Sequence, residues 1–209
     1  DDLISYIIIS IILGGRLGYI VFYNSSYYFN NPVDIFKIWQ GGMSFHGALI
    51  GIIFGTYLFA NKVKINLFFF LDIIASVAPI GIFFGRLANF INSELYGKPS
   101  NFFGSVVFPI VDRIPRHPSQ LYEAMLEGVI LFIVLMNVIR KKEIKIGIVS
   151  ALFMILYGFF RIISEQFREP DVQIGYLFDL FSMGSVLSFF MILIGLFILM
   201  KATNNEFSE

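Results

Sequence analysis

Apolar residues in this chain fall into long runs separated by short polar stretches. A helix that crosses a membrane needs about 20 mostly apolar residues, and several runs reach or approach that length. They are Leu3–Tyr23, Met43–Ala60, Leu67–Ile91, Ala124–Ile139, Ile146–Ile163 and Tyr176–Met200. The pattern predicts an all-α fold, a polytopic transmembrane helical bundle with six spans, in one domain over residues 1–209.

The composition agrees with an integral membrane protein, because 57% of the residues are hydrophobic and only 14% are charged. Lys+Arg and Asp+Glu balance at 15 each, so the charge indicates no nucleic-acid partner. The chain has no cysteine, which excludes disulfides and a thiolate nucleophile of its own. We find no convincing metal-ligand spacing and no phosphate-binding glycine loop, and we expect neither a metal nor another cofactor.

Basic residues indicate the orientation of the spans. The short connections "NKVKIN" (61–66) and "RKKEIK" (140–145) are rich in Lys and Arg, and Lys201 follows the last run. Short basic loops face the cytoplasm, so residues 24–42, 92–123 and 164–175 are predicted outside. The chain opens with "DDL" and no Met. We therefore expect an incomplete N-terminus, with seven spans in the complete protein.

Four polar clusters lie toward the predicted outer side. In the first, His46 starts the second run and is followed by Gly47, Gly51 and Gly55 at four-residue spacing. Small residues at this spacing permit close helix packing. The histidine is either an interfacial residue bonded to a carbonyl or a general base or phosphate donor, and the spacing alone does not decide.

The second cluster ends the third run. Arg86 and Asn89 share a helix face at i and i+3, and Asn92 and Glu94 follow directly. An arginine that only extends its charge to the interface is the alternative. The positive-inside rule, however, disfavours an arginine without a role on the outer side. We therefore favour a functional site.

The third and fourth clusters flank the next two runs. The stretch "RHPSQLYEA" (116–124) has two equally supported interpretations. It is either a helix start at Pro118 or a functional segment with Ser119, Gln120, Tyr122 and Glu123. In "YGFFRIISEQFREPD", Arg161, Glu165 and Arg168 are predicted on one helix face at i, i+4 and i+7. A structural ion pair between Arg161 and Glu165 is the alternative to one that directs Arg161 toward an anion.

Taken together, Arg86 and Arg161 end spans on the same predicted side, with His46 at a matching depth. Two planar guanidiniums suit a phosphate, and a lipid phosphate is the natural ligand at membrane level. A transporter or channel is the main alternative, since intramembrane charges also mark ion pathways. It predicts midplane charges and half-helix repeats, which the sequence does not show. A membrane assembly subunit would leave both arginines unexplained.

Five motifs in order resemble the bacterial prolipoprotein diacylglyceryl transferase family over essentially the whole chain. They are "GGRLGYIVFYN" near the start, "HGALIG" (46–51), "GRLANFINSELYG" (85–97), "RHPSQLYEA" and "RIISEQFREPD". The resemblance implies a multi-pass enzyme of the bacterial plasma (inner) membrane with its site toward the outer leaflet. Such an enzyme moves the diacylglyceryl group of phosphatidylglycerol to the lipobox cysteine of a prolipoprotein signal peptide and releases glycerol phosphate. Its partners would then be these two substrates and membrane lipids.

The resemblance also implies site residues. Arg86 would contact phosphatidylglycerol together with Asn89, Glu94 and Gly97. Arg161 would be the second essential arginine, oriented by Glu165. His46 would be a base for the thiol or a head-group ligand.

Some positions depart from the family pattern. Ala48, Ala88 and Ser93 stand where glycine is usual. The family's first helix, which carries a tyrosine near the site, has no counterpart in this sequence.

Overall fold

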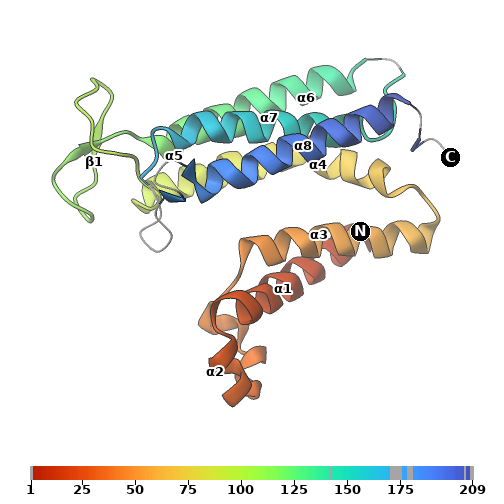
Figure 1. Ribbon diagram of the computed structural model, residues 1–209, viewed down its shortest axis with the longest axis horizontal. Coiled ribbons are helices and arrows are strands. Elements are labelled where there is room, and N and C mark those ends of the chain that lie inside the picture. The colour runs from red at the N-terminus through yellow and green to blue at the C-terminus, as the bar shows by residue number, and fades with distance from the viewer. Residues whose placement is uncertain (1, 142, 170–175, 178–180, 205, 208–209) are drawn as a thin grey trace. The chain divides into compact units, whose positions relative to one another are not determined.

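The computed structural model describes residues 2–141, 143–169, 176–177, 181–204 and 206–207, and it is mostly helical. The chain divides into two compact units, residues 1–71 and 72–209 (Figure 1). The division falls inside the helix α4, between Leu71 and Asp72. Each unit is described by itself.

The first unit is built on two long helices, α1 (Asp2–Tyr23) and α3 (Phe45–Val63). Their backbones approach so closely that a side chain at Gly47 would meet the carbonyl oxygen of Gly14, and one at Gly51 would meet that of Ser10. The predicted stripe of small residues is therefore confirmed as a helix-packing surface.

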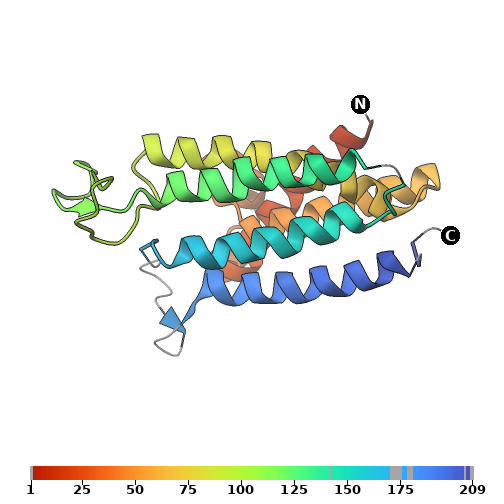
Figure 2. The same cartoon turned by 90° about the horizontal axis from the view of Figure 1, so that it is seen from above.

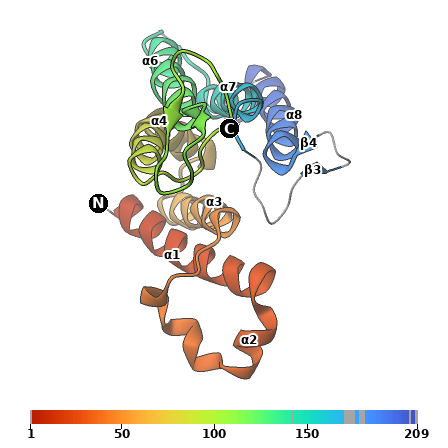
Figure 3. The ribbon, with the colours of Figure 1, turned by 90° about the vertical axis from the view of Figure 1, so that its left-hand side faces the viewer.

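Short helical turns connect α1 to α3: α2 (Ser25–Asn30) and the 3₁₀ turns η1 (Pro32–Phe36) and η2 (Ile38–Gln40). Figure 3 shows this segment curving back toward α3. Arg16 of α1 is 4% exposed and lies beneath it. Its guanidinium lies 5.1 Å from the Tyr28 ring centroid and donates to five carbonyls, those of Asp34, Ile35, Lys37, Gly41 and Gly42, at 2.6 to 3.3 Å. One buried arginine thus holds the connection together.

The second unit packs the following helices side by side (Figure 2). They are the part of α4 (Leu67–Ile91) after residue 71, α5 (Ser119–Glu123) with its π-helical continuation η3 (Ala124–Ile130) and α6 (Leu131–Ile139), then α7 (Ile148–Glu165) and α8 (Met183–Thr203). Their shared core contains Ala75, Leu131, Leu135 and Val149. Gly128 packs against Phe83 of α4, and Gly158 packs against the Ser188 carbonyl of α8.

A half-buried carboxylate joins α4 to the start of α7. Asp72 accepts hydrogen bonds from the backbone N–H groups of Gly147 and Ser150, both at 2.7 Å, and from the Ser150 hydroxyl. It therefore acts as an N-cap supplied by a different helix. Along α4, Arg86 lies 14 positions after Asp72; along α7, Arg161 lies 14 positions after Gly147. The contact therefore sets the two helices in a register that brings both arginines to the same level.

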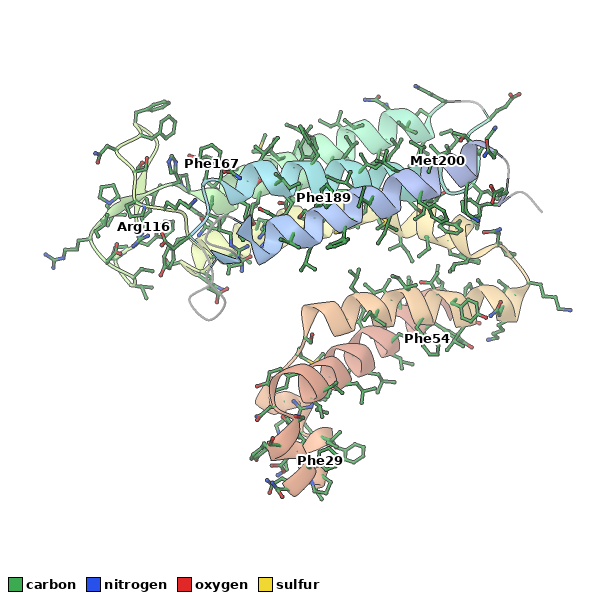
Figure 4. The ribbon with its side chains drawn as sticks, viewed as in Figure 1. Phe29, Phe54, Arg116, Phe167, Phe189 and Met200 are labelled. Carbon is green, nitrogen blue, oxygen red and sulfur yellow. The ribbon has the colours of Figure 1, made fainter. Side chains whose placement is uncertain are left out.

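Residues 92–118 form the polar end of this unit, where β1 (Val106–Val107) pairs antiparallel with β2 (Pro115–Arg116). Figure 4 shows Arg116 in this region and Phe167 just beyond α7. A second antiparallel pair, β3 (Tyr176–Leu177) with β4 (Phe181–Ser182), precedes α8.

Among the described residues, five helices are long and apolar enough to cross a membrane. The apolar part of α3, Gly47–Val63, is shorter. The all-α transmembrane character is supported, while the count of six spans stays a prediction. Two boundaries were wrong. The last helix begins at Met183 and not at Tyr176, because the Ser182 hydroxyl caps it by accepting from Ser185 N–H. The fourth run begins earlier, at Ser119, directly after Pro118.

Candidate functional site

The second unit contains a buried charge cluster where α4, α5, η3 and α7 meet. Its members are three arginines and three glutamates linked by ion pairs, namely Arg86, Arg161, Arg168, Glu123, Glu127 and Glu165. We call these six residues the charge cluster. Full charges inside an apolar bundle are costly and mark functional positions.

Glu123 lies at the centre of the charge cluster with its side chain fully enclosed. Arg86 Nε lies 2.7 Å from its Oε2, and Arg161 Nη1 lies 2.8 Å from its Oε1. Although these distances are short, the N–H groups are not aligned well enough to form hydrogen bonds with the carboxylate. Two guanidiniums from different helices therefore converge on one acidic group.

Glu165 and Arg168 complete one side of the charge cluster. Arg161 Nη2 lies 2.9 Å from Glu165 Oε2, so the predicted i, i+4 pair is present. The predicted helical position of Arg168 was wrong, because α7 ends at Glu165 and the backbone then turns to pair with Gly97. Arg168 nevertheless reaches the charge cluster, with Nη1 3.7 Å from Glu123 Oε1.

Glu127 was missed by the sequence analysis although it lies inside a predicted span. Its side chain is fully enclosed, 3.6 Å from Arg86 Nη2 and 3.7 Å from Arg161 Nη1. A carboxylate four residues after Glu123 in an apolar run was the available signal. Both residues lie where the helix widens into the π-helical η3, a geometry often found at functional sites.

The segment after α4 is held against the start of α5. Gln120 Nε2 donates to the Glu94 carbonyl at 2.6 Å, and Ser119 Oγ donates to that of Leu95 at 3.1 Å. Asn89 Nδ2 donates to Glu94 Oε2 at 3.0 Å. Among the described residues, the side chains of Asn89 and Glu94 bond to each other and form no hydrogen bond or ion pair with the charge cluster.

Backbone geometry explains the glycine-rich signature of this segment. A side chain at Gly97 would meet the carbonyl oxygens of His117 and Phe167, so only glycine fits there. Ser93 stands where the resemblance expects glycine and has φ of 59°, in the left-handed region that favours glycine. The substitution therefore strains the backbone locally, in addition to its small change in side-chain volume.

Arg116 ties the 92–118 segment to the residues after α7. Its guanidinium donates to Asp112 at 2.6 Å, to Glu169 at 3.2 Å and to the Gly97 carbonyl at 3.2 Å. The hydrogen bonds from Arg116 and from the Ile114 N–H lower the pKa of Asp112 below its usual value. These hydrogen bonds of Arg116 hold the 92–118 segment in place where it leads into α5.

His46 lies in the first turn of α3, in the first unit. Its side chain is outside the described atoms, so its matching depth with the arginines stays a prediction.

The fold and site define a membrane-embedded helical protein with a buried arginine–glutamate centre. Residues 1–201 match the family model described as prolipoprotein diacylglyceryl transferase. The chain belongs to this family. It is 51% identical to the phosphatidylglycerol–prolipoprotein diacylglyceryl transferase of Rickettsia bellii, over 96% of this chain and 77% of that protein. It is 52% identical to the enzyme so named from Rickettsia typhi, over 96% and 78%, and 50% identical to that from Rickettsia felis, over 97% and 79%.

Proposed function

We propose that this protein transfers the diacylglyceryl group of phosphatidylglycerol to the lipobox cysteine of prolipoproteins. The substrate sulfur attacks the glycerol carbon that bears the phosphate ester. A sulfur–carbon bond forms, the carbon–oxygen bond breaks, and glycerol phosphate leaves with the electron pair. The thiol proton passes to a proton acceptor. The cysteine belongs to the substrate, in keeping with a chain that has none.

The observation that carries this proposal is the convergence of Arg86 and Arg161 on Glu123, at 2.7 and 2.8 Å. Guanidiniums that share one carboxylate can also share one phosphate, whose oxygens they bind as planar forks. They would stabilise the charge that grows on the leaving glycerol phosphate. Glu165 would orient Arg161 through its 2.9 Å ion pair.

Further parts of the proposal concern the surroundings. We place the protein in the bacterial inner membrane with six spans in this chain and the charge cluster toward the outer leaflet. Asn89, Glu94 and Gly97 shape the phosphatidylglycerol site, and His46 is a candidate for the thiol base or a head-group ligand. The carbonyl contacts of Glu94 with Gln120 and the close packing at Gly97 support a positioning role for that segment.

The test supplies the purified protein with phosphatidylglycerol and a lipobox peptide and detects the thioether-linked product by mass spectrometry. Arg86→Ala and Arg161→Ala should each lower kcat/KM by about 10²–10³-fold or more. Arg113→Ala is the matched control, because Arg113 is an exposed arginine of the 92–118 segment. Absence of product with a working positive control would contradict the activity, and normal rates in either cluster variant would contradict the phosphate site. His46→Gln with a near-normal rate would remove His46 as the base.

A further inference from the structure

The two enclosed glutamates of the charge cluster differ in how well their charges are compensated. Glu123 has guanidinium nitrogens at 2.7 and 2.8 Å. The nearest guanidinium nitrogens to Glu127 lie at 3.6 and 3.7 Å, and no described donor forms a hydrogen bond with either of its oxygens. Both side chains are fully enclosed. Glu127 is therefore the anion that the protein stabilises least.

The groups that face Glu127 come from every helix around it. Arg86 reaches it from α4 and Arg161 from α7. Glu123 from α5, Arg168 after α7 and the Tyr157 phenol of α7 interact with it electrostatically. Repulsion from Glu123 opposes the attraction from the arginines, so the negative charge on Glu127 is the one most easily given up.

The formal charges of the charge cluster cancel, since three guanidiniums face three carboxylates. An entering phosphodiester adds one negative charge, and the leaving glycerol phosphate carries close to two above its second pKa of about 6. An excess of negative charge in an enclosed, low-dielectric site is unfavourable. Uptake of one proton by the site would offset the second charge on the phosphate as it forms.

We propose that Glu127 is the proton acceptor of this site and becomes neutral when a phosphate dianion is bound. The proton balance closes, because the substrate thiol loses one proton, Glu127 gains one, and the phosphate gains one negative charge. Neutral Glu127 no longer competes for Arg86 and Arg161, which leaves both guanidiniums to the dianion. This inference rests on the proposed phosphate site and adds a proton-linked carboxylate to it.

The test is calorimetric binding of glycerol phosphate to the purified protein at about pH 8, in two buffers of different ionisation enthalpy. At this pH the ligand is already a dianion, so protons taken up on binding go to the protein. The unsubstituted protein should take up about one proton per ligand, and Glu127→Gln should take up none. Glu206→Gln is the matched control, because it removes a carboxylate whose ion-pair partner is Lys201, 3.0 Å away and outside the charge cluster, and it should still take up about one.

The pH dependence of the affinity gives a second test. Its first part uses the unsubstituted protein, so it holds even if Glu127→Gln fails to fold. For the unsubstituted protein, Kd should rise by roughly tenfold per pH unit above the pH at which Glu127 ionises. Glu127→Gln, whose amide resembles the protonated acid, should bind at least about tenfold more tightly at pH 9, with little pH dependence.

Three outcomes would contradict the inference. Proton uptake that persists in Glu127→Gln would assign the proton to another group, and binding by the unsubstituted protein without proton uptake would remove the linkage altogether. Both of these results leave the phosphate site intact. Failure of the unsubstituted protein to bind glycerol phosphate would instead overturn the phosphate site and this inference with it.

Discussion

Both units contain buried arginines, and their partners differ in kind. In the first unit, Arg16 is surrounded by backbone carbonyls, which accept hydrogen bonds along the whole guanidinium fork. In the second unit, Arg86 and Arg161 face carboxylates at ion-pair distance, without aligned hydrogen bonds to Glu123. The carbonyls already accept hydrogen bonds from the N–H groups of Arg16, so few donors are left for a ligand. A carboxylate shared by two arginines, in contrast, can be replaced by another anion. The partners, and not burial alone, separate a structural arginine from one in a ligand site.

The largest effect should come from changing the shape of a cluster arginine while keeping its charge. Arg161 uses Nη1 for Glu123 and Nη2 for Glu165, and a lysine ammonium cannot reproduce that fork. We expect Arg161→Lys to lower kcat by about 10²-fold or more, measured as thioether product formed from phosphatidylglycerol and a lipobox peptide. A rate within about threefold of normal would show that charge alone suffices, and the contrast with Arg16 would lose its basis.

Removing the carbonyl-bonded arginine should give the opposite result. Arg16→Ala leaves several carbonyls of residues 34–42 without their charged donor and should destabilise the fold by about 2–4 kcal/mol. The rate per folded molecule should stay close to normal. Trp39, the single tryptophan, lies in this segment and reports its unfolding by fluorescence. Arg113→Ala serves as the exposed control, and a stable Arg16→Ala protein that binds no phosphatidylglycerol would make Arg16 part of the site.

A smaller effect is expected at the other end of α4. Asp72→Asn keeps the volume but removes acceptor capacity for Gly147, Ser150 and the Ser150 hydroxyl. Loss of such a cap costs about 1–2 kcal/mol. If this contact sets the register of α4 and α7, kcat should also fall, because Arg86 and Arg161 no longer meet Glu123 together. Ser150→Ala, which removes only the hydroxyl, should have the milder effect in thermal unfolding and in turnover. Equal effects of the two substitutions would contradict the capping role.

The smallest effect concerns the hydrogen bonds of Arg116 and depends on pH. Its hydrogen bond to Asp112 lowers the pKa of that carboxyl in the folded protein. The stabilisation is therefore complete above the ordinary aspartate pKa near 4 and is lost as the pH falls through the lower folded value. Pepsin cleavage beside the exposed Phe103 should accelerate over that interval. Pepsin should cleave Asp112→Asn rapidly already at pH 4. Identical dependences of the cleavage rate on pH for the two proteins would exclude this role for Asp112.

Local patterns predicted most of the helices. Runs such as Leu67–Ile91 coincide with α4, because length and apolarity are properties of neighbouring residues. The small-residue stripe of Gly47 and Gly51 was likewise recognisable, since its spacing repeats within one helix. The wrong predictions lie where a side chain or a backbone pairing outside the apolar pattern determines the end of a helix. Examples are the Ser182 cap at the start of α8 and the β-bridge that Arg168 forms with Gly97 after α7 has ended.

The site was predicted less completely than the fold. Arg86, Arg161 and the pair with Glu165 followed from costly charges at the ends of runs. Glu123 was named in a segment interpreted equally as a helix start and as a functional stretch, without a role of its own, and Glu127 was overlooked. Nothing in the spacing of "LYEAMLEG" indicates that the helix widens there into a π-helical segment or that both carboxylates turn toward two other helices.

The sequence by itself determined that the chain forms apolar helices with arginines near their ends, because hydropathy and charge act over one or two turns. The tertiary structure alone decided that Arg86 and Arg161 meet at Glu123, with Glu127 as a less compensated neighbour. The ion pairs of Arg86 and Arg161 with Glu123 join residues 37 and 38 positions apart in sequence. They depend on helix register, which the Asp72 contact between α4 and α7 helps to set.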